Sequence, residues 1–367
     1  MPPHVAAFTD TYLPTVNGVT YTIRTWRERW QDRDGRMDVV YPGADEYNPE
    51  AGENPVRSLP FPFYEDFRIG APSIPDAVGE ADIVHAHTPF GLGLGGLRLA
   101  RDLDRPLVAS YHTPTSEYAG YLAEGWLLDA VARVGKTYER WFLGRADHVI
   151  APSETARAAL VSRGVGPVSV VPNGVDIDRF APVGSSDFRA RYDLPEEGTK
   201  PLVGYTGRHG FEKRLTDLVR AAEGMDATFV LGGDGPARKT LQEEAAERDA
   251  DIRFLGFLDR EELSEFYSAL DAFAFPSPVE TQGLVALEAM ACGTPVVGVD
   301  SGALTETIDD GETGYHYDPG DIAGFRNSLD RTLAERDSLT ETCRARREAM
   351  SVEHSVDALA AVYDTVL

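Results

Sequence analysis

The chain has 367 residues, with 60 acidic and 35 basic side chains and a formal net charge of −25 at pH 7. At about 150 residues per domain, this length predicts two domains or one large one. A hydrophobic fraction of 42% supports a substantial core and excludes a disordered chain. The negative charge repels phosphodiesters, so nucleic acid is not expected as a partner.

The basic residues are strongly biased toward arginine, since 31 of the 35 are arginine and four are lysine. An acid-rich, lysine-poor protein with a good core indicates a halophilic, high-salt cytoplasm, where carboxylates stay hydrated and their repulsion is screened. A GC-rich coding bias is the alternative explanation, and the sequence leaves both open.

Cysteine use and hydropathy indicate the compartment. The two cysteines, Cys292 and Cys343, are too few for a disulfide framework or an unaided zinc site, which fits a reducing environment. Residues 1–8 lack the charged start and apolar core of a signal peptide, and no stretch approaches the roughly 18 apolar residues of a membrane span. We expect a cytoplasmic protein, and peripheral attachment to the inner face of the cell membrane remains open.

Short apolar runs alternate with helical patterns along the first half of the chain. Strands are predicted at 4–8, 37–41, 82–87, 106–111, 147–151 and 168–171, and helices at 19–33, 94–103, 117–144 and 153–164. Buried strands that alternate with helices are typical of a parallel sheet covered by helices on both faces.

The second half repeats this plan after a break at Pro172-Asn173-Gly174. The polar stretch 176–199 that follows is expected to be irregular, and the two domains are expected to join near 173–199. Strands are predicted at 201–206, 226–231, 251–255, 271–275 and 295–299, and helices at 213–224, 236–248, 260–268, 283–291 and throughout 322–367. We therefore predict an α/β protein with two doubly wound domains, 1–172 and 173–345, and a terminal helical segment, 346–367, that returns to the first domain.

Residues 91–96 (GLGLGG) match the G-x-G-x-x-G pattern of dinucleotide-binding folds. That fold also requires an acidic residue about 20 positions further on, at the end of the next strand, to hold the ribose. Here the next strand ends at Ser110-Tyr111-His112, and the pattern lies late in the domain. Close packing of helix on sheet is the better interpretation, and NAD binding is not expected.

Two cations follow the first strand of the second domain. Arg208 lies at the end of this strand and Lys213 enters the next helix, at the edge where doubly wound sheets bind ligands. An arginine fork and a lysine point charge together suit a diphosphate. Two solvated surface cations are the alternative, but residues 176–367 carry a net charge of −19 and three lysines, so an incidental pair is less expected there.

Two acidic residues, Glu280 and Glu288, frame the start of another predicted helix in this domain. Free N–H groups at residues 282–284 can face a sugar or phosphate, and Glu288 can accept two ribose hydroxyls. A capping acid and a solvated helical acid are the common alternative for such a pattern.

These motifs together resemble those of family 4 retaining glycosyltransferases. The resemblance is carried by E-x₇-E at 280–288, GR-x₄-K at 207–213, VPNGVD at 171–176, LGGDGP at 231–236, FTDTYLPTVNGV at 8–19, DIVHAHTP at 82–89 and SYHT at 110–113. It covers nearly the whole chain in the expected order. It implies the GT-B fold, in which two Rossmann-like domains face each other and the active site lies in the cleft between them.

The resemblance also implies roles for residues of the second domain. Arg208 and Lys213 would neutralise the diphosphate as the bond to the sugar breaks, which takes the place of a metal ion. Glu288 would hold the ribose, and Glu280, with main-chain N–H groups near Gly283 and Leu284, would hold hydroxyls of the donor sugar. Gly207 would join the donor-binding residues.

In the first domain, the resemblance places Gly18 against the phosphates, because a side chain there would obstruct their approach. His112 would contact the sugar or phosphate near the anomeric carbon. Asp10, Tyr12 and His87 are acceptor-side candidates, whereas one of His85 and His87 is expected to pack in the protein interior.

One position departs from the family pattern, since many relatives carry an aromatic residue where this chain has Gln282. The E-x₇-E spacing is intact. No Asp-x-Asp stands where a metal-dependent transferase needs one. We therefore expect no cofactor and no metal, with a UDP- or GDP-linked sugar as co-substrate.

The acceptor is expected to be a membrane lipid or a lipid-linked glycan, because residues 8–19, 61–64 and 280–283 look most like relatives that glycosylate lipids. Segment 121–145 mixes arginines with Trp126, Leu127, Leu128, Val131, Val134, Trp141 and Phe142. Such a mixture can lie in a membrane interface, and a helix packed in the core is the alternative. Three other functions stay open: a nucleotide-sugar epimerase or hydrolase, a transferase with a non-lipid acceptor, and a non-catalytic sugar-binding protein.

Overall fold

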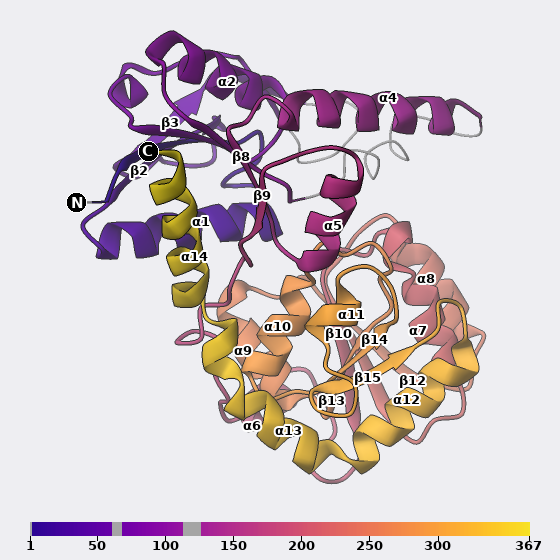
Figure 1. Cartoon of the computed structure of the whole chain (residues 1–367). Helices are drawn as coiled ribbons and strands as arrows, with labels where there is room; N and C mark the ends of the chain where they lie inside the picture. The colour runs from indigo at the N-terminus through magenta and orange to yellow at the C-terminus, as the bar shows by residue number, and fades with distance from the viewer. Residues whose placement is uncertain (1, 61–67, 113–125) are drawn as a thin grey trace. The chain divides into compact units, whose positions relative to one another are not determined.

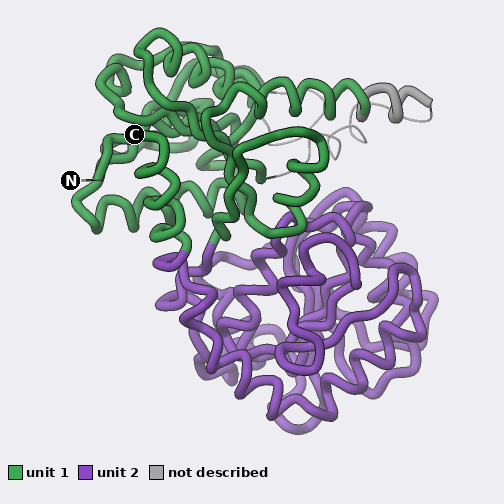
Figure 2. Tube along the Cα trace, viewed as in Figure 1, with its two compact units in different colours: residues 1–173, 355–367 green, residues 174–354 purple. Residues whose placement is uncertain are grey.

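The computed structural model describes residues 2–60, 68–112 and 126–367, and among these the side chains of 126–132 are not described (Figure 1). The chain divides into two compact units (Figure 2). Unit 1 comprises Met1–Asn173 and Ser355–Leu367, and unit 2 comprises Gly174–His354.

Unit 1 is built on a seven-stranded parallel sheet with the order β3-β2-β1-β6-β7-β8-β9. Its strands are β1 (His4–Phe8), β2 (Arg36–Pro42), β3 (Glu53–Val56), β6 (Ile83–Ala86), β7 (Leu107–Ser110), β8 (His148–Ala151) and β9 (Val168–Val170). In the register, Val5 of β1 lies opposite Met37 of β2 and Ile83 of β6. β1 therefore pairs on one side with β2, the next strand in the sequence, and on the other side with the more distant β6. The topological switch point of this sheet lies between β1 and β6.

Helices connect these strands, and a small antiparallel pair lies beside them. The helices of unit 1 are α1 (Gly18–Asp32), α2 (Gly91–Leu103), α4 (Trp126–Leu143), α5 (Glu154–Ser162), the short η1 (Asp76–Val78) and most of α14 (Val352–Val366); the pair is β4 (Ser58–Pro60) with β5 (Arg68–Gly70). α14 lies next to α1 in Figure 1, and the Trp30 and Tyr363 rings meet edge to face at 5.3 Å. The end of the chain thus belongs to the core of the first unit.

Unit 2 is built on a six-stranded parallel sheet with the order β12-β11-β10-β13-β14-β15. Its strands are β10 (Leu202–Thr206), β11 (Thr228–Gly232), β12 (Asp251–Gly256), β13 (Ala272–Phe275), β14 (Val296–Val299) and β15 (Gly314–Tyr317). This order matches that of dinucleotide-binding sheets, and its switch point lies between β10 and β13.

The helices of unit 2 are short, and the 3-10 helices η3, η4 and η5 lie among them. They are α6 (Ser186–Arg191), η3 (Phe211–Lys213), α7 (Leu215–Ala221), α8 (Arg238–Ala246), η4 (Arg260–Glu262), α9 (Leu263–Ala269), α10 (Leu284–Ala291), α11 (Leu304–Thr307), α12 (Ile322–Ala334), α13 (Arg336–Ala345) and η5 (Arg347–Met350).

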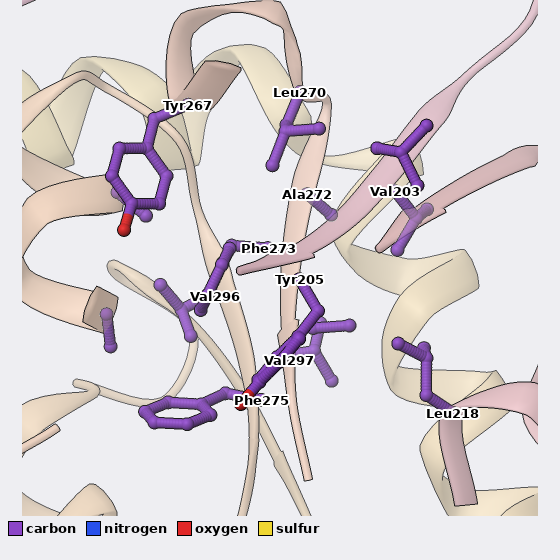
Figure 3. Packing of buried hydrophobic residues seen from close by; sticks show 14 of the residues in the cluster. Val203, Tyr205, Leu218, Tyr267, Leu270, Ala272, Phe273, Phe275, Val296 and Val297 are labelled. Carbon is purple, nitrogen blue, oxygen red and sulfur yellow. The ribbon is translucent and has the colours of Figure 1, made fainter. Parts of the chain in front are cut away.

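The core of unit 2 forms because both faces of its central strands are apolar. Figure 3 shows part of this core, where Tyr205 of β10 lies near Phe273 and Phe275 of the neighbouring strand β13. The Tyr205 and Phe273 rings stack at a centroid distance of 6.1 Å. Such continuous apolar runs are typical of parallel strands that are buried on both sides.

All eleven predicted strands are present at the expected positions, and the α/β fold is confirmed. The strands β3, β4, β5 and β15 were missed, because none of them stands out as an apolar run. The expectation that 176–199 is an irregular linker was wrong: it contains α6, and its Phe180 and Phe188 are buried in the core of unit 2. The predicted continuous helix at 322–367 is divided into α12, α13, η5 and α14.

The close packing expected for residues 91–96 is present. A Cβ atom on Gly93 would lie 1.9 Å from the carbonyl oxygen of Thr88, and one on Gly96 would lie 3.1 Å from the ring of Phe8. The glycines therefore allow α2 to pack directly on the sheet. In the parts of the chain that the structure describes, no helix combines the length and apolarity needed to cross a membrane.

Candidate active site

The candidate site in unit 2 lies at its switch point, where two neighbouring strands end. The loop after β10 carries Arg208 and leads into η3, and the loop after β13 carries Glu280 and leads into α10. In parallel sheets, the crevice beyond the carboxyl ends of such strands is where ligands bind. The two sequence motifs are 67 residues apart, and the strand order brings them together.

Lys213 and Glu280 form the central ion pair of this site. The Nζ atom of Lys213 lies 2.7 Å from Oε1 of Glu280, and the two side chains are 23% and 15% exposed. Burial by itself lowers the pKa of Lys213, but the Glu280 carboxylate outweighs it and raises the pKa above its usual value. A permanently charged ammonium group is therefore held at the end of the sheet.

Arg208 lies in the same neighbourhood as this pair. Its guanidinium is 3.5 Å from Oε1 of Glu212, and the Glu212 carboxylate also contributes to raising the pKa of Lys213. The Tyr205 hydroxyl donates to the carbonyl oxygen of Arg208 at 3.3 Å. Arg208 pairs with Glu212 and Lys213 with Glu280, and both cations interact with the charge of Glu212. Two cations close together suit an anion with several oxygens.

The backbone next to Arg208 is in close contact with a second glycine-containing loop, the one that follows β11. Gly207 has a φ of +141°, and a Cβ atom on Gly233 would lie 2.0 Å from the Gly207 carbonyl oxygen. Between these loops, the buried His209 donates from Nε2 to the carbonyl oxygen of Gly232 at 3.2 Å. The sequence analysis missed His209, although its place in the GR-x₄-K motif was a usable signal.

Gly283 ends the loop that carries Glu280. It is the N-cap of α10 with a φ of +81°, and a Cβ atom there would lie 2.8 Å from Leu304. The loop is also fixed by segment 301–307, in which Ala303 N–H donates to the Glu280 carbonyl at 3.2 Å. Leu284 begins α10, so its N–H group lies in the first turn, where helices attract negative charge.

Glu288 is buried on α10 and is already part of a polar network. Its Oε2 accepts a hydrogen bond from the Tyr267 hydroxyl at 2.9 Å, and its Oε1 lies 3.5 Å from Arg260. Burial raises the pKa of Glu288, and the charge of Arg260 and the Tyr267 hydrogen bond oppose this rise. Nothing in the spacing of the sequence identified Tyr267 or Arg260 as partners of Glu288.

Three histidines of unit 1 meet at the carboxyl end of its sheet. The His85 and His87 rings stack at 4.0 Å, and the His87 and His112 rings stack at 5.4 Å. His85 packs in the interior, and His87 with His112 occupies the end of β6 and β7. The structure therefore brings the predicted His112 and His87 together.

Asp10 and Tyr12 are buried and serve internal contacts. The Asp10 carboxylate accepts from the Thr88 hydroxyl at 2.6 Å and from the Leu92 N–H at 3.0 Å, which caps the start of α2. Tyr12 donates its hydroxyl to Glu53 at 2.9 Å. At Gly18, by contrast, nothing within the described residues lies within 4 Å of an added Cβ atom, so this helix start has open space in front of it.

The exposed face of α4 is apolar and basic. Val134 and Trp141 are 69% and 42% exposed, whereas Phe142, which was a membrane candidate, is buried in the core of unit 1. The guanidinium of Arg145 lies 3.9 Å from the centre of the Trp141 ring. The candidates Trp126, Leu127, Leu128 and Val131 and segment 61–64 lie outside the described side chains.

Two family models match this chain, and the boundary between them lies close to the boundary between the two units. Residues 16–179 match the family described as Glycosyltransferase Family 4, and residues 187–350 match Glycosyl transferases group 1. The alpha-monoglucosyldiacylglycerol synthase of Streptococcus pneumoniae is 30% identical, over 95% of this chain and 83% of that protein. A GDP-mannose-dependent alpha-mannosyltransferase of Corynebacterium glutamicum is 29% identical, over 95% of this chain and 85% of that protein.

Solved structures agree on the architecture. The sucrose-phosphate synthase of Thermosynechococcus elongatus aligns with a TM-score of 0.78 at 24% identity, over 99% of this chain and 98% of that chain. Two Rossmann-like α/β domains in one chain make up the GT-B fold. The chain belongs to glycosyltransferase family 4.

Proposed function

We propose that this glycosyltransferase moves a hexose from a UDP- or GDP-linked sugar to an acceptor hydroxyl and retains the anomeric configuration. The observation that carries the proposal is the partly buried Lys213–Glu280 pair near Arg208 at the switch point of unit 2. Two cations at this edge suit the diphosphate of a nucleotide sugar, and the C. glutamicum relative is named for a GDP-linked donor.

The chemistry needs stabilisation of the leaving group. As the bond between the anomeric carbon and the diphosphate oxygen breaks, negative charge grows on the diphosphate, and Arg208 and Lys213 neutralise it. No metal ion is needed for this step. Glu288 holds the ribose, and Glu280 with the N–H groups of Gly283 and Leu284 holds the sugar hydroxyls.

The same pair supports a reaction that retains the anomeric configuration without a covalent intermediate. Because Oε1 of Glu280 accepts a charged hydrogen bond from Lys213, this carboxylate is a weak nucleophile. The acceptor hydroxyl instead attacks the face from which the diphosphate departs, and its proton passes to the departing diphosphate oxygen. His112 contributes a polar contact near the anomeric carbon.

A membrane lipid or lipid-linked glycan is the proposed acceptor, reached at the inner face of the cell membrane. Support comes from exposed residues of α4 and of the turn after it, where the cations Arg133, Lys136, Arg140 and Arg145 accompany the apolar Val134 and Trp141. The one acidic residue between them, Glu139, has a buried side chain and pairs with Arg163 at 3.2 Å. A basic, aromatic surface on a chain of net charge −25 suits anionic lipid headgroups.

The acidic, lysine-poor composition supports operation in high salt. We expect the free energy of unfolding to rise from low to about 2 M KCl, because screening weakens the repulsion among carboxylates. Stability that stays constant over this range would leave GC-rich coding bias as the explanation of the lysine deficit.

The proposed function is tested by nucleotide release from UDP- and GDP-sugars, with and without a membrane lipid extract and with and without EDTA. We expect release that needs lipid, survives EDTA and is lost in Arg208→Ala, with the α-linkage of the donor retained in the product. Release that ignores lipid would contradict a lipid acceptor. Conversion of the donor without any acceptor would instead indicate an epimerase or hydrolase.

Full turnover by Arg208→Ala would contradict the diphosphate assignment. Loss of release in EDTA, restored by a divalent cation, would contradict metal independence. An inverted product would contradict front-face attack while leaving the donor site intact. Each part of the proposal therefore has its own outcome.

A further inference from the structure

In the histidine stack of unit 1, which comprises His85, His87 and His112, the Nε2 atom of His87 is buried without a hydrogen-bond partner among the described residues. His85 has a hydrogen-bond partner on both ring nitrogens: Nδ1 meets the Tyr363 hydroxyl and Nε2 meets the Ser110 hydroxyl, both at 2.7 Å. His87 Nδ1 lies 3.1 Å from Nε2 of His112.

The stack is fixed from several sides. Trp26 lies within 6.4 Å of all three imidazole rings, measured between ring centres. Its own Nε1–H donates to the Ser355 hydroxyl at 2.8 Å and lies 3.1 Å from the Asn173 carbonyl oxygen. Trp26, which is fixed by its own hydrogen bonds, thus packs against all three imidazole rings. These contacts restrict the positions of the rings, so the hydrogen bond between His87 and His112 has a defined geometry.

Only one proton can lie between His87 and His112. Burial lowers the pKa of His87 well below its usual value and the pKa of His112 to about 4, so both rings are neutral near pH 7. A neutral imidazole carries one N–H donor and one acceptor nitrogen. The proton in the hydrogen bond therefore belongs either to His87 Nδ1 or to His112 Nε2, and this choice decides the tautomers of both rings.

The buried Nε2 of His87 decides between the two arrangements. If His112 Nε2 donates, His87 Nδ1 must accept, and the proton of His87 then sits on Nε2 as a buried, unsatisfied N–H group. Orphaned N–H donors are rare in protein interiors, and leaving one unpaired carries the full desolvation penalty. If His87 Nδ1 donates, Nε2 is left as an unpaired acceptor nitrogen, and unpaired acceptors are better tolerated in protein interiors than orphaned N–H donors.

We propose that His87 is a positioning residue: it donates its Nδ1–H to Nε2 of His112 and so fixes His112 as the Nδ1–H tautomer. His112 Nε2 then accepts a hydrogen bond from His87, so any hydrogen bond that this ring donates comes from its Nδ1–H. A role of this N–H group toward substrate rests on the proposed function, whereas the tautomer assignment is independent of it. His87 acts through His112 and has no direct contact with substrate in this assignment.

The direct test is ¹⁵N NMR of the full chain labelled with ¹⁵N-histidine, because protonated and unprotonated ring nitrogens have well-separated shifts. His112 is assigned by the signals lost in His112→Gln. We expect an unprotonated Nε2 and a protonated Nδ1 in His112, and the same pattern in His87. A protonated Nε2 in His112 would overturn the proposal even in a fully active transferase.

Two substitutions of similar shape, His87→Asn and His87→Asp, extend this test because only the first provides an N–H donor. Asparagine in His87→Asn offers an N–H donor in place of Nδ1, whereas the carboxylate of His87→Asp only accepts. We expect the His112 shifts of His87→Asn to resemble wild type. In His87→Asp, His112 is expected to gain a proton on Nε2, and kcat is expected to fall at least about tenfold below that of His87→Asn.

The matched control is His148→Asn, which alters another buried histidine of unit 1, paired through Nε2 with Ser169. It is expected to leave the His112 shifts unchanged. If His87→Asp and His87→Asn give the same His112 tautomer and the same kcat, His87 has a merely structural role and the proposal fails. If turnover is absent in every variant and in wild type while the shifts behave as expected, the proposed function fails and the tautomer assignment stands.

Discussion

Lys213 Nζ and Glu280 Oε1 lie 2.7 Å apart, although the two residues are separated by 67 positions in the sequence. The pair forms because β10 and β13 are neighbours in the sheet, so their following loops meet at one edge. The ammonium group is charged and oriented before any donor arrives. Such preorganisation lowers the reorganisation needed when charge develops on a leaving group.

Replacement of Lys213 by methionine should remove a main source of leaving-group stabilisation. We expect kcat of Lys213→Met to fall by about 10²–10³-fold with the fold intact, because one preorganised charge donor contributes roughly this much. The matched control is Lys239→Met, which alters an 87% exposed lysine paired weakly with Glu243. Equal losses in the two variants would contradict a specific role of Lys213.

The partner carboxylate allows a stability test of the same pair. We expect a coupling of about 0.5–3 kcal/mol between Lys213→Met and Glu280→Gln in urea unfolding of the two single variants and the double variant. Each single variant leaves one half-buried group without its partner, whereas the double variant removes both. Additive losses would show that the 2.7 Å contact contributes no net interaction.

Substitutions of Gly283 and Gly18 should have different effects, because the first glycine is required by the backbone and the second is expected to be required by the donor. Gly283→Ala is expected to lower the free energy of unfolding by about 1–3 kcal/mol, because its φ of +81° is strained for alanine and the new Cβ atom meets Leu304. Gly18→Ala should change stability by less than about 1 kcal/mol, since its surroundings are open. If phosphates approach this helix start, Gly18→Ala still raises KM for the donor. An unchanged KM would argue against that approach.

Arg260 is expected to keep Glu288 ionised for the ribose. Burial raises the pKa of Glu288 and Arg260 opposes this rise, so Arg260→Leu raises that pKa further. Because the protonated carboxyl is a poorer acceptor, KM for the donor in Arg260→Leu should increase as pH falls from 8 to 6, more steeply than in wild type. Arg331→Leu, which alters an exposed residue paired with Glu335, is the control. Parallel profiles for all three proteins would contradict this role.

His85 should make the unfolding free energy depend on pH. Burial, with a smaller contribution from His112, lowers its pKa from 6.5 to about 3, so the unfolded chain binds one more proton between these values. Stability from this residue is present above pH 6.5 and is lost as pH falls toward 3. The loss is at most about 1.4 kcal/mol per pH unit.

Urea unfolding of wild type and His85→Gln between pH 4.5 and 6.5 measures this difference. The variant is expected to be less stable, because it loses hydrogen bonds to Tyr363 and Ser110, but its stability should depend less steeply on pH. If the unfolding free energies of the two proteins depend equally on pH, His85 is protonated as readily in the folded chain as in the unfolded chain, and the prediction is wrong.

The exposed face of α4 predicts binding to anionic vesicles. Trp141→Ser should weaken binding to vesicles that contain an anionic lipid by about tenfold, because an aromatic ring inserts into the headgroup region. Phe257→Ser removes a 67% exposed aromatic of unit 2 and serves as control. In 1 M salt the Debye length is about 3 Å, so the contribution of the four cations should shrink and that of Trp141 should persist. Equal effects of the two substitutions would contradict a membrane surface on α4.

Local sequence patterns predicted most of the fold. Apolar runs such as 4–8 and 201–206 identified buried strands because burial on both faces imposes a continuous hydrophobic requirement. The edge strands β3 and β15 were missed, since Glu53–Val56 and Gly314–Tyr317 carry too few apolar residues to form such a run. The stretch 176–199 was misread because two buried phenylalanines are sparse among polar residues.

The motifs of the site were visible in the sequence, but their partners were not. Arg208, Lys213 and Glu280 follow strand ends, and their chemistry could be inferred from residue type and position. Glu288 instead lies against Arg260 and Tyr267, and no periodicity relates these three residues. Their contact depends on how α9 and α10 pack, which is decided by shape across the whole core.

The sequence by itself determined the acidic charge, the two α/β sheets and the placement of cations and carboxylates at strand ends, because these follow from composition and local period. Only the tertiary structure decided which of them meet. Strand order pairs Lys213 with Glu280, and the return of α14 to unit 1 places Tyr363 against His85, 278 residues away. Such contacts join groups that share no local pattern, so they are fixed when the sheets and helices pack together.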